Sequence, residues 1–255
     1  MNIVVAVKIV PDDQDIKVES NRELDYTKAR PVVSTYDLNA IEGAAQLASA
    51  QGAKLTAISV GGDIVKDSKV AKNILARGVD EYITISDDSC ENMEAFLSAK
   101  VLASAVNDQV PFDLIVCGDG SADQYAQQVD VQLAEALGVP IINAVSSIAF
   151  EGEKLIVERV LETEKETVEV VLPAVISVVP DVALPRICGM KEILAAGKKP
   201  VKNITAEQLG VNVVPSIQVL DTLAPIPTDR KLAVFDLSVD GDIDKFVTSL
   251  QEAIR

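Results

Sequence analysis

The chain has 255 residues, of which 48% are hydrophobic, and a formal net charge of -16. A chain of this length and hydrophobicity can bury a full core, as one large domain or as one domain with an appendage. The acidic charge argues against nucleic acid and anionic membrane surfaces as partners, because phosphates would repel it. Since no apolar run reaches the roughly 18 residues needed to cross a bilayer, we expect no membrane insertion.

Cysteine and histidine usage narrows the possible chemistry. Cys90, Cys117 and Cys188 have no CxxC spacing, so they predict neither a disulfide framework nor a thiolate metal site. This cysteine usage is typical of a protein in the reduced cytoplasm. The opening residues begin a predicted strand directly and show no pattern of a secretory leader, which we also expect of a cytoplasmic protein. Histidine, the commonest general base and metal ligand, is absent. We therefore expect no catalytic residue and no metal.

The first half of the chain alternates apolar, β-rich runs with helical patterns. Strands are predicted at residues 3–9, 55–60, 82–85 and 112–117, and helices near 36–50, 65–77 and 92–106. Buried strands joined by helices predict a parallel sheet covered on both faces. Ser34 and Asp37 match a capping box at the start of the first helix.

Residues 116–143 predict a strand, a polar loop and a helix. Gly118 and Gly120 allow a tight turn, and residues 138–140 end the helix with Gly and Pro. One helical face is predicted from the four-residue spacing of Tyr125, Val129, Leu133 and Leu137. The strand end and helix start predict a phosphate seat, although an ordinary βα loop has the same pattern. Neither GxGxxG nor GxxxxGK[ST] is present, so the ligand is not specified.

Beyond residue 142 the predicted strands are shorter. Residues 144–150, 154–161 and 167–172 indicate an antiparallel excursion, and 173–179 rejoins the buried sheet with Pro173 at its first position. Prolines punctuate the remainder, so 211–237 reads as an extended arm. The chain closes with a helical apolar stripe at Ile243, Phe246, Val247, Leu250 and Ile254. That stripe predicts docking on its own domain or on another subunit.

Four ordered blocks resemble the electron transfer flavoprotein β subunit. They are VKIVPD at 7–12, YDLNAIE at 36–42, VERVLETEKETVEVVLPAVIS at 157–177 and PRICGMKEILAAGKKP at 185–200. Together they cover nearly the whole chain to about Leu209. The loop GDGSADQYAQQV is most similar to the FixA-type branch, associated with electron delivery in anaerobic carnitine-type metabolism or nitrogen fixation.

The resemblance implies an α/β fold: a doubly wound, mostly parallel sheet of the adenine-nucleotide α-hydrolase-like type, with a C-terminal arm and helix. It implies a nucleotide-binding domain at 1–210, and an arm plus helix at 211–255 that docks on an α subunit. In such a heterodimer the α subunit carries the redox-active FAD. This chain would add AMP or a second FAD, and would be an electron carrier subunit rather than an enzyme.

The resemblance also assigns nucleotide contacts to strand ends and loops. They carry over to Ala6, Ser34, Thr35, Tyr36, Asp37, Val60, Gly118, Asp119, Gly120, Ser121, Ala122, Asp123, Gln124, Tyr125, Ala126, Gln127, Gln128 and Val129. Where the family commonly reads D, G, D, T, this chain has Asp123, Gln124, Tyr125 and Ala126. Ala126 lacks the hydroxyl of that threonine, which leaves backbone NH groups, Ser121, Gln127 and Gln128 to bind phosphate.

Residues 185–195 resemble the loop with which the family docks on acyl-CoA dehydrogenases. The docking residues implied are Arg186, Ile187, Met190 and Lys191, with Met190 as the apolar anchor. A quinone oxidoreductase or a ferredoxin is a further implied partner. The alternative is a helix in which Ile187, Met190, Ile193 and Leu194 pack on the sheet.

Two other functions compete with the carrier. A stand-alone nucleotide sensor of the universal-stress type predicts a stable monomer, whereas the arm and terminal stripe predict a chain that associates when its partner is absent. An ATP-splitting synthetase of the same fold class needs a Gly/Ser-rich loop after the first strand. Here that place holds VPDDQD, whose acids would repel a triphosphate.

Overall fold

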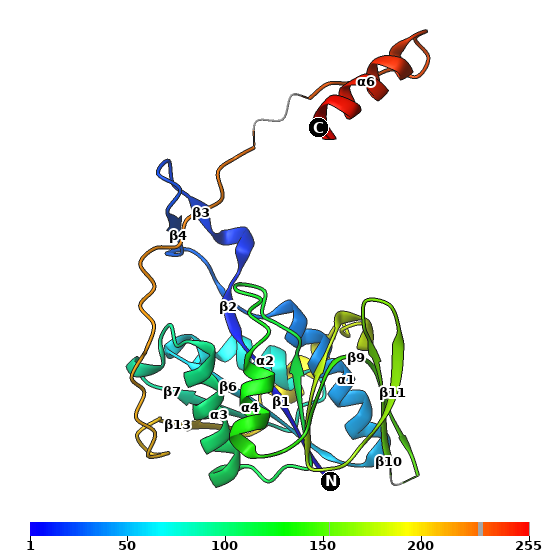
Figure 1. Cartoon of the computed structure of the whole chain (residues 1–255). Helices are drawn as coiled ribbons and strands as arrows, with labels where there is room; N and C mark the ends of the chain where they lie inside the picture. The colour runs from blue at the N-terminus through cyan, green and yellow to red at the C-terminus, as the bar shows by residue number, and fades with distance from the viewer. Residues whose placement is uncertain (153, 229–231, 255) are drawn as a thin grey trace. The chain divides into compact units, whose positions relative to one another are not determined.

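The computed structural model describes residues 1–152, 154–228 and 232–254, and its centre is a sheet of nine strands (Figure 1). In chain order these are β1 (Asn2–Ala6), β6 (Lys54–Gly61), β7 (Glu81–Ser86), β8 (Leu114–Gly118), β9 (Ile141–Glu151), β10 (Lys154–Val160), β11 (Lys165–Val170), β12 (Ala174–Val178) and β13 (Val201–Ile204). Their spatial order is β11-β10-β9-β12-β8-β1-β6-β7-β13. Among these described strands only the pairs β9–β10 and β10–β11 are antiparallel, which confirms the doubly wound, mostly parallel sheet.

Helices cover both faces of the sheet. On one face are α1 (Thr35–Gln51) and α2 (Ser68–Leu75), and on the other are α3 (Ala95–Gln109) and α4 (Val129–Leu137). Strand β1 shows why: Ile3 and Val5 belong to the core beneath α1 and α2, whereas Val4 and Ala6 belong to the core beneath α3 and α4. Successive side chains of a strand point to opposite faces, so an entirely apolar strand needs cover on both.

Several element boundaries differ from the prediction. The run at 3–9 is two strands, because the chain turns after Ala6 and β2 (Ile9–Pro11) pairs antiparallel with β5 (Pro31–Val33). Helix α2 starts later than predicted, since Asp67 caps it by accepting from the Lys69 and Val70 amides. Helix α3 runs from residue 95 to 109 instead of 92 to 106. Strand β13 was not predicted, because it is a mostly exposed edge strand with little apolar pattern, and neither were the two-residue strands β3 (Lys17–Val18) and β4 (Leu24–Asp25).

The antiparallel excursion is present as β9, β10 and β11. Strand β9 begins three residues before the predicted start, because Ile141 and Ile142 pair parallel with β12 while its later residues pair with β10. Residue 153, in the predicted EGE turn, lies outside the described residues. Pro173 directly precedes β12, so the strand itself starts at Ala174.

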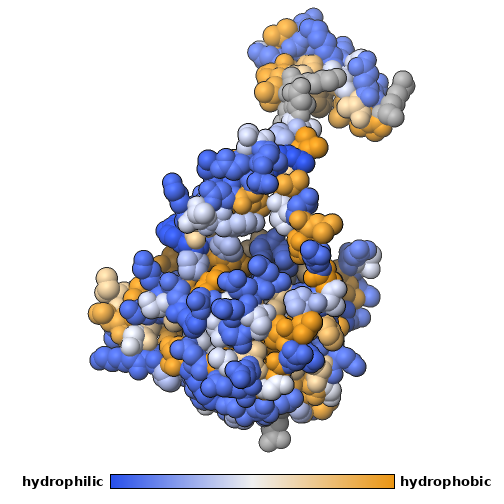
Figure 2. Space-filling model, turned by 90° about the vertical axis from the view of Figure 1, so that its left-hand side faces the viewer, coloured by the Kyte–Doolittle hydropathy of each residue, from blue (hydrophilic) through white to orange (hydrophobic). Residues whose placement is uncertain are grey.

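Contacts divide the described residues into two compact units, 1–17 with 25–221 and 18–24 with 222–255. In the smaller unit the Ala224 amide donates to the Arg22 carbonyl at 2.9 Å. It also contains helix α6 (Asp242–Ile254), on which Phe246 contacts Phe235 with ring centroids 5.6 Å apart. The predicted stripe of α6 is exposed, by 42% to 77% per residue, and Figure 2 shows hydrophobic side chains at the surface of this helical segment. What this stripe docks on stays a prediction, as does the arm, part of which (229–231) is outside the described residues.

None of the helices in the described ranges has both the length and the apolar character that a membrane span requires.

The core contains one phenol whose replacement tests this packing. The Tyr82 side chain is fully buried, and its hydroxyl donates to the Val65 carbonyl at 3.1 Å. We expect Tyr82→Phe to lower the free energy of unfolding by about 1 kcal/mol, because the buried carbonyl loses this donor. Urea-induced unfolding measures the change, with Tyr26→Phe as the control at a side chain that is 45% exposed. Equal effects of the two substitutions would contradict this account of the core.

Candidate functional site

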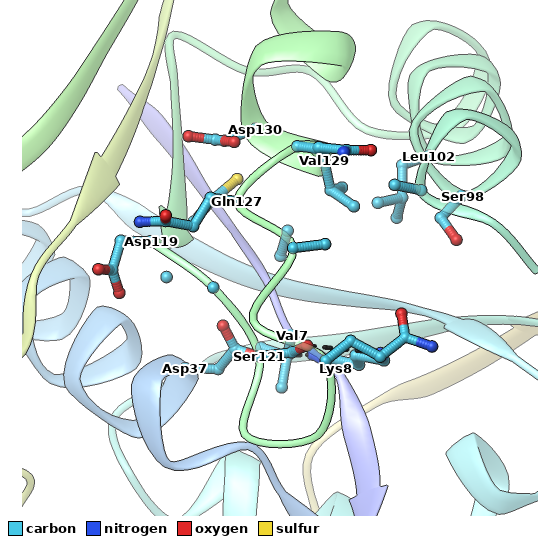
Figure 3. A pocket seen from close by; sticks show the side chains of 18 of the residues that line it. Val7, Lys8, Asp37, Ser98, Leu102, Asp119, Ser121, Gln127, Val129 and Asp130 are labelled. Atoms are coloured by element: carbon cyan, nitrogen blue, oxygen red, sulfur yellow. Dashed lines mark hydrogen bonds between the residues drawn. The ribbon is translucent and has the colours of Figure 1, made fainter. Parts of the chain in front are cut away.

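A pocket lies where the carboxyl ends of β1, β6 and β8 meet. Its wall includes Ala6 and Gly118, the last residues of β1 and β8, and Val60, the last but one residue of β6. In the close view, Asp37 from α1, Asp130 from α4, and Ser98 and Leu102 from α3 surround the same opening (Figure 3). After β1 the chain adds β6 and β7 on one side of the sheet and β8 on the other. Such a reversal of strand order is where open α/β sheets bind ligands.

Asp37 ties the floor of the pocket together. Its carboxylate accepts from the Lys8 amide at 2.7 Å and from the Gly118 amide, so it joins the end of β1 to the end of β8. Ser34 is the N-cap residue of α1 but makes no capping bond. Its hydroxyl accepts instead from the Ala122 amide at 3.2 Å. The predicted capping box is therefore wrong: both side chains hold the loop after β8 instead of the first turn of their own helix.

Burial governs the charge of Asp37. Removal from water raises its pKa to about 7, and the amides of Lys8 and Gly118 and the Lys8 charge oppose that rise only in part. The carboxyl is 5% exposed. Near neutral pH it therefore exchanges a proton, unlike an aspartate in water.

The glycines of the loop are required by close approach. A Cβ at Gly118 would lie 2.6 Å from Asp37 Oδ1, and one at Gly120 would lie 2.3 Å from the ring of Tyr125. Both distances are shorter than any that a methyl group tolerates. Two side chains, one on α1 and one on the loop, thus occupy the space that the missing Cβ atoms leave.

Tyr125 is not on the helical face where the four-residue spacing placed it. Helix α4 begins at Val129, and Tyr125 lies in the loop with a φ of 46°. Its ring contacts that of Tyr36 at a centroid distance of 4.9 Å, and its hydroxyl donates to Asp119 Oδ2 at 2.6 Å. That bond raises the pKa of Tyr125 to about 12. The contacts of the ring and hydroxyl with Tyr36 and Asp119 hold Tyr125 in the loop, although its spacing from Val129 predicted a place on the helix.

Lys8 brings a positive charge to the pocket. Its Nζ lies 2.7 Å from Asp123 Oδ2 and 3.5 Å from Ser121 Oγ. Burial raises the pKa of Asp123, but the hydrogen bonds from Lys8 and Ser121 outweigh it and hold that pKa below the usual value. A carboxylate of the loop therefore occupies the position on Lys8 that an anionic ligand would take.

Three helices begin beside the pocket, which is lined by Asp37 near the start of α1, Ala95 at the start of α3 and Val129 at the start of α4. None of the three has a side-chain cap, whereas α2, which begins elsewhere, is capped by Asp67. Free amides and the positive ends of helix dipoles attract anions. The pocket can therefore bind a phosphate despite its aspartates.

One wall atom lacks a partner. Asp119 Oδ1 is buried and accepts no hydrogen bond from the described residues, although Oδ2 of the same carboxylate accepts from Tyr125. A buried acceptor without a donor is costly. It fits a ligand that presents a hydroxyl or an amino group at this point.

The family model described as electron transfer flavoprotein domain matches residues 25–209. The match covers more than half of the chain. The chain belongs to the electron transfer flavoprotein family. The matched span includes α1, β6, β8 and the whole loop before α4, and therefore most of the pocket.

The structure gathers most of the nucleotide contacts that the sequence resemblance assigned. The pocket is lined by Ala6, Asp37, Val60, Gly118, Asp119, Gly120, Ser121, Gln124, Ala126, Gln127, Gln128 and Val129. Outside the lining are Ser34, Thr35, Tyr36, Ala122, Asp123 and Tyr125. Apart from Thr35, at the start of α1, these support the loop or pair with a lining residue. Whether any of these residues contacts a nucleotide stays a prediction for this family member.

Other lining residues were not predicted, and they lie on or next to β1, α3, β8 and α4. These are Val7 and Lys8 after β1, Met93 before α3, Ala95, Ser98 and Leu102 on α3, Cys117 on β8 and Asp130 on α4. Lys8 lies two residues beyond Ala6, at the edge where parallel strands end, so its position was a usable signal. The α3 residues have an ordinary amphipathic pattern, which contains no signal of a pocket. Burial raises the pKa of the Cys117 thiol well above its usual value, so that lining cysteine is no nucleophile.

The four residues predicted to dock lie on or before α5 (Met190–Ala196), which is exposed except at Ala196. Ile187 is 99% and Met190 72% exposed, and Ile193 and Leu194 are exposed as well. The alternative of a helix packed on the sheet through these four residues is therefore wrong. Arg186 is held by a bidentate ion pair with Glu42 of α1, with Nε 2.6 Å from Oε2 and Nη2 3.0 Å from Oε1. Lys191 lies in the exposed first turn of α5.

In the described part of the chain, no group of three or more His, Cys, Asp or Glu side chains is placed to hold a metal ion.

The pKa of Asp37 gives a pH dependence of known sign. Its value of about 7 in the fold lies above the ordinary 3.8 of the unfolded chain. The unfolded state therefore loses this proton first, and the contribution of Asp37 lowers the free energy of unfolding as pH rises from about 4 to about 7. We expect the ¹³C signal of this carboxyl to titrate near pH 7.

The matching variant is Asp37→Asn, which has no proton to lose. Its free energy of unfolding should fall less between pH 5 and 7 than that of the native chain, whatever its absolute level. Asp63→Asn, at an exposed side chain, serves as the control. An unchanged slope in Asp37→Asn would show that this carboxyl is ionised throughout.

Proposed function

We propose that this chain is the β subunit of a heterodimeric electron transfer flavoprotein of the FixA-type branch, and that its pocket binds an adenine nucleotide. The observation that carries the proposal is the coincidence of two independent results. The pocket lies at the strand ends where the sequence resemblance assigns a nucleotide, and the family match spans the loop that forms it.

The pocket residues fit the parts of such a nucleotide. The uncapped start of α4 and the ammonium of Lys8 are suited to a phosphate. The unpartnered oxygen of Asp119 is suited to a ribose hydroxyl or to the adenine amino group. Apolar side chains such as Val60 and Leu102 line the remainder, where a flat base is desolvated.

The nucleotide is AMP or a second FAD. Ala126 lines the pocket without the hydroxyl that the family commonly places there, so phosphate binding rests on backbone amides, Lys8, Ser121, Gln127 and Gln128. Either molecule presents an adenosine phosphate to these groups. Composition analysis of the purified complex distinguishes them.

Electron transfer requires a second subunit. When bound by the α subunit, FAD supplies the redox chemistry, and electrons pass between it and an acyl-CoA-type dehydrogenase, a quinone oxidoreductase or a ferredoxin. This chain supplies the docking segment around Met190 and, in the α6 stripe, an apolar face for the α subunit. The complex is proposed to work in the cytoplasm.

The decisive experiment is co-expression with a cognate α subunit, followed by counting FAD and AMP per heterodimer. We expect one FAD with one AMP, or two FAD. One FAD with one AMP would indicate a simple electron carrier. Two FAD would supply the second flavin that electron bifurcation requires. A complex that holds flavin but no adenine nucleotide in this subunit would contradict the assigned pocket.

The second candidate is a stand-alone nucleotide sensor, favoured by the pocket alone. It predicts that the chain purifies as a stable monomer and binds nucleotide without flavin. Size-exclusion chromatography of the chain expressed with and without the α subunit separates the two functions. A monomer that ignores the α subunit would favour the sensor.

Lys8 and Asp123 predict changes of opposite sign in nucleotide affinity. Lys8→Gln should weaken AMP binding about tenfold, because a charge-assisted hydrogen bond to phosphate is lost. Asp123→Asn should strengthen it about threefold, because the carboxylate no longer competes for Lys8. Equilibrium dialysis of the nucleotide-free heterodimer measures both, with Lys100→Gln as a control for net charge. Changes in the same direction would show that Lys8 does not contact the phosphate.

Met190 tests the docking segment. Because its side chain is 72% exposed, Met190→Asp should leave folding and α-subunit binding intact. Electron transfer to the dehydrogenase should fall about tenfold or more, since a carboxylate enters an apolar pocket only at a large desolvation cost. Met190→Leu keeps the apolar volume and should retain the rate. An unchanged rate of electron transfer in Met190→Asp would show that Met190 is not the docking anchor.

A further inference from the structure

A second cavity lies on the docking face, away from the nucleotide pocket. It has a volume of about 480 Å³ and lies between α2 and the segment that leads into α5. It is lined by Lys69, Lys72, Asn73, Ala76, Arg77, Pro185, Arg186, Ile187, Cys188 and Ile193. We refer to it as the α2 groove. Lys69 lies three and four positions before Lys72 and Asn73, so these three share one face of α2, and Ala76 follows as its C-cap residue.

The α2 groove is basic in a chain of net charge -16. Its lining contains four cationic side chains and no carboxylate. Of these cations, Arg186 is neutralised by Glu42. Arg77 donates to neutral acceptors, the Arg186 carbonyl at 2.6 Å and Asn73 Oδ1 at 3.1 Å. Lys69 and Lys72 form no ion pair within the described part of the chain.

Two carboxylates on or next to α1 and α2, Glu42 and Asp67, are already engaged. Glu42 accepts three hydrogen bonds from Arg186 and one from Gln46. Asp67 accepts from the first-turn amides of α2. Three positive charges therefore line the groove without an ion-pair partner among the described residues, and they repel one another unless an anion is present.

The rim of the α2 groove is apolar and exposed. Ile187, at its edge, is 99% exposed, and Leu184, Met190 and Leu194 near it are exposed by 67% to 90%. A small anion would bind the cationic side chains and leave the apolar side chains of the rim exposed to water. A protein surface that sets carboxylates beside an apolar pocket would satisfy both, because charge complementarity fixes its register while the apolar side chains supply buried area.

We propose that the α2 groove receives acidic side chains of the protein that exchanges electrons with this complex, with Lys69, Lys72 and Arg77 as their partners. This inference rests on the proposed function for the identity of the partner. The binding chemistry itself, carboxylates beside leucine-like side chains, follows from the groove alone. Nucleic acid is disfavoured by the large negative charge of the chain.

The test uses the full-length chain, as the heterodimer if it purifies with an α subunit. The probe is a dye-labelled peptide of alternating glutamate and leucine residues. Fluorescence anisotropy measures the affinity. We expect the double variant Lys69→Gln/Lys72→Gln to weaken binding about tenfold, since two ion pairs are lost. The control Lys100→Gln/Lys165→Gln makes the same change of net charge at exposed sites outside the groove lining and should bind like the native chain.

Three outcomes would overturn the proposal. Equal binding of a peptide with glutamine in place of glutamate would show that only the apolar rim acts. Release of the peptide by inorganic phosphate, at an ionic strength where chloride does not release it, would show a small-anion site. Unchanged peptide binding by Lys69→Gln/Lys72→Gln would show that these lysines do not bind the acidic side chains.

Electron exchange with a purified acyl-CoA dehydrogenase separates this inference from the proposed function. If the native complex exchanges electrons and Lys69→Gln/Lys72→Gln is slower, with a weaker dependence on salt, both stand. If the native complex exchanges electrons and this variant matches it in rate and salt dependence, the groove fails while the function stands. If no exchange occurs but the glutamate peptide still requires both lysines, the function fails and the groove remains an acidic-segment site.

Discussion

The pocket depends on one buried carboxylate. Asp37 accepts amides from Lys8 and Gly118, and so it fixes the distance between the ends of two central strands and the start of α1. The contact is close enough that only glycine fits at residue 118. The direction in which the loop leaves β8 follows from that contact, and the placement of the start of α4 follows from the loop. Burial of the carboxylate is unfavourable by itself, and the two amides offset part of that cost.

Among the described residues, groups that attract anions gather at two of the cavities, and they have a different physical source at each. At the nucleotide pocket these groups are the uncapped starts of α1, α3 and α4 together with Lys8. At the α2 groove they are side chains alone. Backbone amides suit a compact phosphate held at fixed distances, whereas lysines on long stems adapt to carboxylates on another protein.

The sheet and its two helical layers were predictable because apolar runs and helical periods are set by burial, which the sequence records directly. The position of the pocket was predictable for the same reason, since the ends of parallel strands share one edge. The contacts inside it were not: Ser34 and Asp37 read as a cap, and Tyr125 as part of a helix, because only the tertiary structure brings the loop onto α1. Edge strand β13 was missed because an exposed strand needs no apolar alternation.

Helix α1 supports both regions that the proposed function uses. Asp37 in its first turn holds the nucleotide loop, and Glu42, five residues on, holds Arg186 of the docking segment. Five helical residues span about 7.5 Å, and a buried helix packed on the sheet does not bend over that distance. The docking segment is therefore kept in register with the nucleotide pocket by a single rigid element. On the proposed function, the spacing between the bound nucleotide and the surface where the partner docks is therefore set by α1, whichever nucleotide fills the pocket.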